Sequence, residues 1–168
     1  MDYKKYIFDE SLRGGDFYPL KPFFRAALRA FSPSKQIGLY STLCVGKDLS
    51  IVAPGELGCA ESATRLVNVL FPGAINITTS TLSLYQDVIH NPHWKSVSQP
   101  KNGCMILAAT TQGRDPKTHG HVGFVWNEIV YSNNSLTKVW DKHISVRAFI
   151  NMFIKQGFPI HYYVIQNV

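Results

Sequence analysis

The sequence predicts an α+β fold in which helices come first and an antiparallel sheet follows. Apolar residues recur at helical spacing within 22–31 and 59–70, which indicates two amphipathic helices. After residue 100 the pattern changes to short apolar runs typical of strands, two of which flank Asn127-Glu128 as in a hairpin. This order of elements favours helices packed on one sheet.

In the first third of the chain, residues 1–20 are expected to form a loop or a loosely fixed arm. The helix predicted for 22–31 has Pro22 in its first turn, where proline is tolerated. It is expected to stop at Ser32-Pro33-Ser34, and residues 37–53 are predicted to be mixed in structure.

Two further helices are predicted in the middle of the chain. The first covers 59–70 and follows the turn-rich stretch 54–58. The second covers 80–90, with Ser80 as its N-cap residue. The remaining elements are expected to be strands at 105–109, 122–126, 129–132 and 160–166, with a helix at 146–156.

Length and charge limit the classes of function. A chain of 168 residues is expected to form one domain, 1–168, and to act as a monomer. Its net charge of +6 favours anionic partners such as a bacterial cell wall. The basic residues are dispersed, so no specific nucleic acid is expected as a partner.

Neither a membrane span nor a secretion signal is expected. No window approaches the roughly 18 apolar residues that a spanning helix needs. Acidic residues stand near the start, at Asp2, Asp9 and Glu10, where a signal peptide would be apolar. We therefore expect a protein that is cytoplasmic when made and acts on the wall after release or delivery.

Of the three cysteines, Cys59 is the candidate nucleophile. An odd number of cysteines without a C-x-x-C pair favours free thiols over disulfides or a zinc site, and no cofactor is expected. Cys59 follows Gly58 at the predicted start of a helix, where free N–H groups lower a thiol pKa and stabilise an oxyanion. The alternative is a small buried apolar residue.

His121 is the candidate base. It opens an apolar strand, Gly120 precedes it, and Gly123 lies on the same strand face, where its missing side chain lets another element approach closely. The other histidines, at 90, 93, 119, 143 and 161, lack such a setting. The alternative is a histidine satisfied within the core.

A third group is predicted from the hairpin register. A two-residue turn at Asn127-Glu128 places His121 opposite Asn134, and a three-residue turn places it opposite Asn133. Either amide can accept the imidazole N–H and fix its tautomer. The alternative is that both asparagines belong to a polar turn.

These motifs together resemble the CHAP and NlpC-type cysteine peptidases, and the likeness is to phage-encoded peptidoglycan hydrolases. The resemblance covers residues 54–135, from Gly58-Cys59-Ala60-Glu61-Ser62 to the histidine motif and a polar residue on the next strand. It implies a papain-like fold with Cys59 as nucleophile, His121 as base and then acid, and Asn133 or Asn134 as the orienting group.

The chain departs from the family pattern in three places. Gly58 stands where an aromatic residue often precedes the nucleophile, and Cys104 stands where an aspartate often follows glycine. The upstream oxyanion donor has no clear match, and the resemblance offers Tyr40 or Gln36 for that role.

The resulting expectation is a cysteine-dependent amidohydrolase or endopeptidase that acts on a peptide or amide bond of bacterial peptidoglycan. One alternative is a catalytically degenerate binding or phage virion component. Another is an acyl- or amide-transfer enzyme that uses the same pair. A metal site at His119 and His121 is disfavoured, because the spacing matches no usual motif.

Overall fold

The computed structural model describes residues 21–53, 58–110, 119–166 and 168. Within them the chain forms five helices and six strands, so the predicted α+β class is confirmed. Four of these helices precede all six strands, as the sequence indicated, and the fifth lies before the last strand. The predicted arm at 1–20 and most of the turn-rich stretch 54–58 lie outside the described residues.

The helices agree with the predictions at α4 and α5 and differ near the start. Ser32-Pro33-Ser34 was predicted to end a helix; it also begins the next one, because proline is tolerated at a first helical position. A helix therefore replaces part of the mixed region. The helices are α2 (Pro22–Leu28), α3 (Pro33–Leu43), α4 (Cys59–Leu70), α5 (Thr81–His90) and α6 (Val146–Lys155).

The strands form one antiparallel sheet in the order β1-β6-β2-β3-β4-β5. Two of them, β1 and β5, were not predicted, because β1 is very short and β5 lacks a clear apolar alternation. The strands are β1 (Trp94–Ser96), β2 (Met105–Ala108), β3 (His121–Trp126), β4 (Ile129–Asn133), β5 (Trp140–Ser145) and β6 (Ile160–Ile165).

The hairpin between β3 and β4 has a two-residue turn. Trp126 pairs with Ile129, and the two residues between them have positive φ angles, 48° at Asn127 and 61° at Glu128. Positive φ at both central positions is the pattern of a type I′ turn, which matches the twist of the flanking strands. The turn forms although neither residue is glycine.

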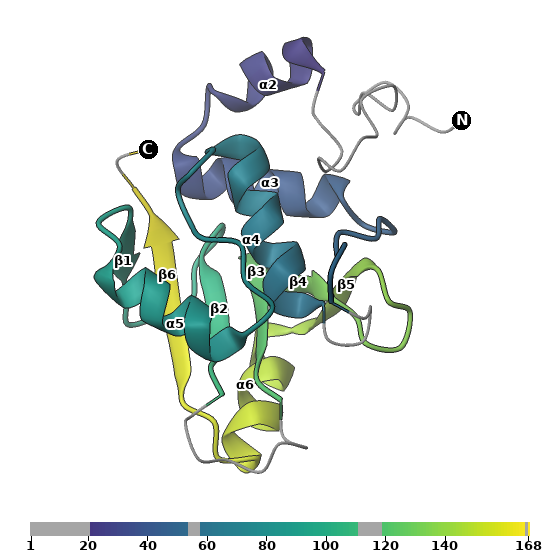
Figure 1. Ribbon diagram of the computed structural model, residues 1–168, viewed down its shortest axis with the longest axis vertical. Helices are drawn as coiled ribbons and strands as arrows, with labels where there is room; N and C mark the ends of the chain where they lie inside the picture. Colours follow the sequence, from purple (N-terminus) through teal and green to yellow (C-terminus); the bar gives the residue numbers. More distant parts are fainter. Residues whose placement is uncertain (1–20, 54–57, 111–118, 167) are drawn as a thin grey trace.

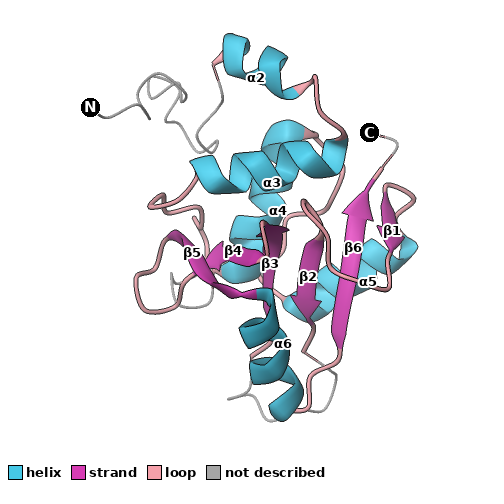
Figure 2. Ribbon diagram, turned by 180° about the vertical axis from the view of Figure 1, so that it is seen from behind, coloured by secondary structure: helices cyan, strands magenta, loops and turns pink. Residues whose placement is uncertain are grey.

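The sheet has two covered faces, because successive side chains of a strand point to opposite sides. On one face Leu107 and Val122 belong to a core that α3, α4 and α5 complete. On the other face Ile106 and Ala108 belong to a second core that α6 completes. Figure 1 shows α4 and α5 in front of the strands, and Figure 2, from behind, shows α6 on the near side.

None of the described helices is both long enough and apolar enough to cross a membrane.

Candidate functional site

Cys59 is the first residue of α4, as the sequence predicted. Gly58 immediately before it is closely packed, since an added Cβ there would lie 2.9 Å from the Ser50 hydroxyl oxygen. The Cys59 side chain is 9% exposed, and its sulfur lies 4.0 Å from the carbonyl oxygen of Gly120. The start of α4 therefore lies against the start of β3.

The Cys59 thiol is not activated in this arrangement. Burial raises its pKa to about 11, although the main-chain N–H groups of Val122, Ala60 and Cys59 itself act to lower it. The predicted lowering by a helix N-terminus is therefore outweighed by the cost of placing a thiolate in a closed environment. At neutral pH the group is a thiol.

Cys59 and His121 open on one cavity of about 710 Å³, which we call the Cys59 cavity. It lies at the end of the sheet, where the starts of α4, α5 and β3 meet the last turns of α6. The cavity contains thiol, imidazole and hydroxyl groups but no carboxylate among its described lining. The lining residues are Cys59, Thr79, Ser80, Thr81, Leu82, Thr110, His119, Gly120, His121, Ser135, His143, Met152, Phe153 and Gln156.

The His121 ring lies on the α6 face of the sheet, away from the sulfur. Residue 121 pairs with Ala108, which belongs to the second core, and the imidazole stacks on Phe153 with ring centroids 5.8 Å apart. Cys59 belongs to the first core. Within the described part of the chain, the only hydrogen bond of the ring is to Ser132, so none joins it to the thiol.

Ser132, and not an asparagine, is the hydrogen-bond partner of the imidazole. The His121 Nε2 atom lies 3.0 Å from the Ser132 hydroxyl oxygen. The β3–β4 pairing ends at Phe124 and Tyr131, and its register, if continued, would put Asn134 opposite His121; the Asn134 side chain accepts the N–H of Leu136 at 2.9 Å instead. The predicted contact of the imidazole with Asn134 is therefore wrong, because that amide is used within its own turn.

Asn133 does not contact the imidazole either. Strand alternation directs the Asn133 side chain to the opposite face from Ser132, where it is buried. Its amide nitrogen would lie 3.4 Å from a Cβ atom added at Gly58. The prediction that Asn133 orients His121 is thus wrong for this structure. Asn133 lies instead beside the helix start that carries Cys59.

Tyr40 is a core residue in α3. Its side chain is 0% exposed, and it does not line the Cys59 cavity. Burial, followed by the proximity of Cys44, raises its pKa well above the ordinary value. The predicted oxyanion role is therefore not available to Tyr40. Gln36, the other residue considered, donates to the carbonyl oxygen of Phe31 at 2.8 Å.

His143 was missed because the strand that carries it, β5, gives no clear signal in the sequence. Its ring centroid lies 5.4 Å from that of His121. Burial lowers the pKa of His143, while the nearby charge of Asp141 raises it. Its Nδ1 atom is buried without a hydrogen-bond partner among the described residues. The imidazoles of His121 and His143 therefore lie close together in the Cys59 cavity, which His119 also lines.

The partly buried His121 ring is neutral. Burial, with a smaller contribution from His143, lowers its pKa to about 3. The ring is therefore uncharged at neutral pH and can accept a proton, although burial makes the protonated form costly.

Because the His121 ring is neutral when folded, we expect the free energy of unfolding to depend on pH. The folded pKa of His121 lies below the unfolded value of roughly 6.5, so below that pH the unfolded chain binds a proton that the folded chain does not. We expect the free energy of unfolding to fall by up to about 1.4 kcal/mol per pH unit as the pH drops from 6.5 to 5. Urea unfolding at several pH values measures it. His121→Gln should show a shallower slope, and an unchanged slope would assign the proton to another group.

The approach to Cys59 is anchored by Glu61, which is 0% exposed. Its carboxylate accepts the N–H groups of three consecutive residues, 51–53, at distances between 2.7 and 3.1 Å. It also accepts the Arg65 Nε–H at 2.7 Å. The sequence suggested a role in complementing the helix dipole; in the structure Glu61 ties the preceding loop to α4.

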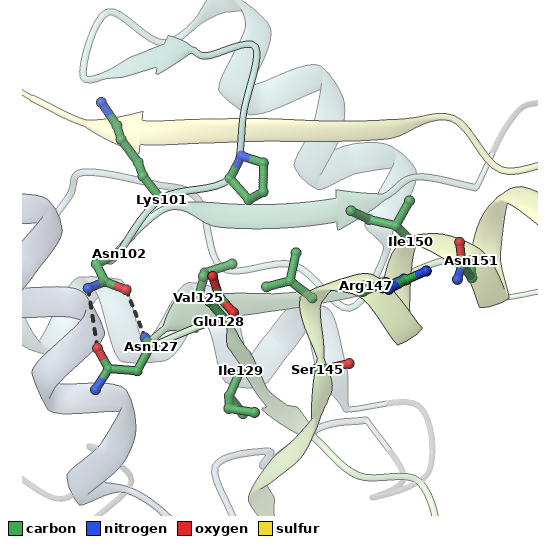
Figure 3. A pocket seen from close by; sticks show the side chains of 12 residues that line it. Lys101, Asn102, Val125, Asn127, Glu128, Ile129, Ser145, Arg147, Ile150 and Asn151 are labelled. Carbon is green, nitrogen blue, oxygen red and sulfur yellow. Dashed lines mark hydrogen bonds between the residues drawn. The ribbon is translucent and has the colours of Figure 1, made fainter.

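A second cavity of about 510 Å³ lies beside the β3–β4 turn and the start of α6 (Figure 3). Asn102 and Asn127 are joined at its rim, where the Asn127 main-chain N–H donates to the Asn102 side-chain oxygen at 2.7 Å. Val125, Ile129 and Ile150 give it apolar walls. None of its described lining residues is a cysteine or a histidine, so it offers no thiol chemistry.

Metal-binding groups and the other two cysteines are the remaining candidates for chemistry in the described part of the chain. Among the described residues, no group of three or more His, Cys, Asp or Glu side chains is arranged to hold a metal ion. Cys44 and Cys104 form no disulfide within the described part of the chain, and both are fully buried. Burial raises the pKa of Cys104 to about 11.

The chain matches no protein family, no curated protein and no solved structure.

Proposed function

We propose that this protein is a cysteine-dependent amidohydrolase or endopeptidase that acts on bacterial peptidoglycan. The observation that carries the proposal is that the Cys59 thiol, at the start of α4, and the His121 imidazole, at the start of β3, open on one cavity. A helix with the thiol, followed by an antiparallel sheet with the imidazole, is also the order of the papain-like CHAP and NlpC-type peptidases.

In the proposed reaction the Cys59 sulfur attacks an amide carbonyl while its proton passes to His121. His121 then gives this proton to the leaving amine as the C–N bond breaks. Water, deprotonated by the same imidazole, hydrolyses the thioester and restores the thiol. The His121 ring is hydrogen-bonded to Ser132 on the α6 face of the sheet, so the ring must turn toward the Cys59 sulfur before the sulfur attacks.

The nature of the cavity and the charge of the chain support a wall peptide as substrate. The hydroxyl-bearing residues Thr79, Ser80 and Ser135 of the Cys59 cavity can hydrogen-bond to peptide carbonyl and amide groups. The net charge of +6 favours a polymer rich in carboxylates. The proposal includes action on the wall after release or delivery of the protein.

A catalytically degenerate binding or virion component is the second candidate function. Two observations favour it: the pKa of Cys59 is raised to about 11, and the His121 ring lies on the other face of the sheet. Such a protein would keep the cavity as a binding site for wall fragments without cleaving them.

Hydrolysis of purified sacculi tests the proposed function. We expect the wild-type protein to release soluble wall fragments, and we expect Cys59→Ala to reduce the rate by at least about 1000-fold, because it removes the nucleophile. Cys104→Ala is the matched control, since it removes a buried thiol of the second core and should keep activity.

Release of fragments at equal rates by the wild type and Cys59→Ala would contradict the proposed function. Sedimentation of both proteins with sacculi, without release of fragments, would support the second candidate.

A further inference from the structure

Three segments that are far apart in the sequence are joined by hydrogen bonds beside Cys59. The Thr110 N–H donates to the Thr81 hydroxyl oxygen at 3.2 Å, and the two threonine hydroxyl oxygens are 2.9 Å apart. The Gly120 N–H donates to the Thr110 hydroxyl oxygen at 2.8 Å. We call these three residues the threonine bridge; it links the start of α5 to the residue before β3.

Gly120 is held closely within the threonine bridge. An added Cβ at this position would collide with the carbonyl oxygen of Ala108 and would lie 2.5 Å from the Thr81 hydroxyl oxygen and 2.7 Å from the Thr110 nitrogen. Such distances are too short for any larger side chain. The main chain at Gly120 therefore has little room to move while the bridge is intact.

The threonine bridge ends at the candidate nucleophile. The carbonyl oxygen of Gly120 lies 4.0 Å from the Cys59 sulfur. The main-chain N–H of Val122 is also a hydrogen-bond donor to that sulfur and acts to lower its pKa. Both threonines, Gly120 and Cys59 line the Cys59 cavity. Thr81 itself is buried, so its hydroxyl group is directed to these contacts and not to bulk solvent.

We propose that Thr81 is a positioning residue that acts through Thr110 to hold the main chain of Gly120 against the Cys59 sulfur. This inference rests on the proposed function for the catalytic meaning of Cys59 and adds a residue to the same site. Positioning matters because an attacking sulfur must be held within a narrow range of distances and angles to the substrate.

The test compares Thr81→Val, which keeps the shape but loses the hydroxyl group, with Thr81→Ser, which keeps the hydroxyl group. The measurement is the rate at which iodoacetamide alkylates Cys59 in the folded protein at pH 8.5, followed by mass spectrometry of the Cys59 peptide. We expect Thr81→Val to accelerate alkylation at least about fivefold, because a loosened strand start exposes the sulfur.

Thr81→Ser should stay within about twofold of the wild type, because it restores both hydrogen bonds. Alkylation of the buried Cys104 in the same sample reports general opening of the fold and should not change. Should Thr81→Val not fold, the pair Thr110→Val and Thr110→Ser is judged by the same criteria.

Three outcomes would overturn the inference: equal Cys59 rates in Thr81→Val and wild type, equal acceleration by serine and valine, or parallel acceleration at Cys104. Alkylation needs no turnover of a substrate. A protein that leaves sacculi intact but shows the expected pattern would therefore lose the proposed function and keep the role of Thr81. A protein that hydrolyses sacculi but does not show this alkylation pattern would keep the proposed function and lose the role of Thr81.

Discussion

Gly103→Ala is expected to lower the free energy of unfolding by about 2–4 kcal/mol. Gly103 has a φ angle of +80°, which costs an L-residue about 1 kcal/mol or more. An added Cβ would also collide with the main-chain carbonyl of Ser34 at the start of α3. Because a main chain cannot rotate away as a side chain does, relieving the collision means moving α3 away from the sheet, at a further cost of about 1–3 kcal/mol.

Gly73→Ala provides a matched control for this prediction. Gly73 has the same φ angle of +80°, but an added Cβ there would have no atom within 4 Å. We therefore expect a loss of only about 1 kcal/mol, from the backbone conformation alone. Urea unfolding of both variants measures the difference. Equal losses in the two variants would show that the contact with Ser34 adds nothing.

Glu61→Gln is expected to cost about 3 kcal/mol, because it removes the charge of a fully buried carboxylate that accepts four N–H groups. The glutamine amide has one oxygen and brings its own N–H donors toward those of residues 51–53. Arg65 also loses its ionic partner. Asp87→Asn is the control, since among the described residues the Asp87 carboxylate accepts one N–H, from Asn76 at 2.8 Å; this variant should cost about 1 kcal/mol or less.

Glu61→Gln is also expected to make the free energy of unfolding less sensitive to acid. Burial acts to raise the pKa of Glu61, but the N–H groups of Ala53, Arg65, Ile51 and Val52 outweigh it and lower the pKa. Stability from this carboxylate is therefore present above the unfolded pKa and is lost as the pH falls through the folded value. Urea unfolding below pH 5 should show a steeper loss in the wild type than in Glu61→Gln. Equal slopes would contradict this account.

Local signals in the sequence were sufficient for the elements that lead into the site. The apolar spacing of 59–70 gave α4 with its correct bounds, and Ser80 caps α5 by accepting the Ser83 N–H at 3.3 Å. The turn between β3 and β4 was also found, although its length was left open. Helix bounds, caps and turns depend on residues that are neighbours in the sequence, so a local sequence pattern is enough to predict them.

The contacts of the candidate site depended on packing between distant elements. Which face His121 takes is set by its pairing with Ala108 and by the aromatic side chains of α6, neither of which a local pattern contains. The partner of its ring became Ser132 because strand alternation puts that hydroxyl, and not the amide of Asn133, on the same face.

By itself the sequence determined the α+β class, the helix that begins at Cys59 and the strand that carries His121, because hydrophobic periodicity and capping act over a few residues. Only the tertiary structure decided that Cys59 is a neutral thiol, that His143 joins His121, and that Tyr40 is core. The reason is physical: burial, which sets these pKa values and contacts, is produced by segments that meet only when the chain is folded.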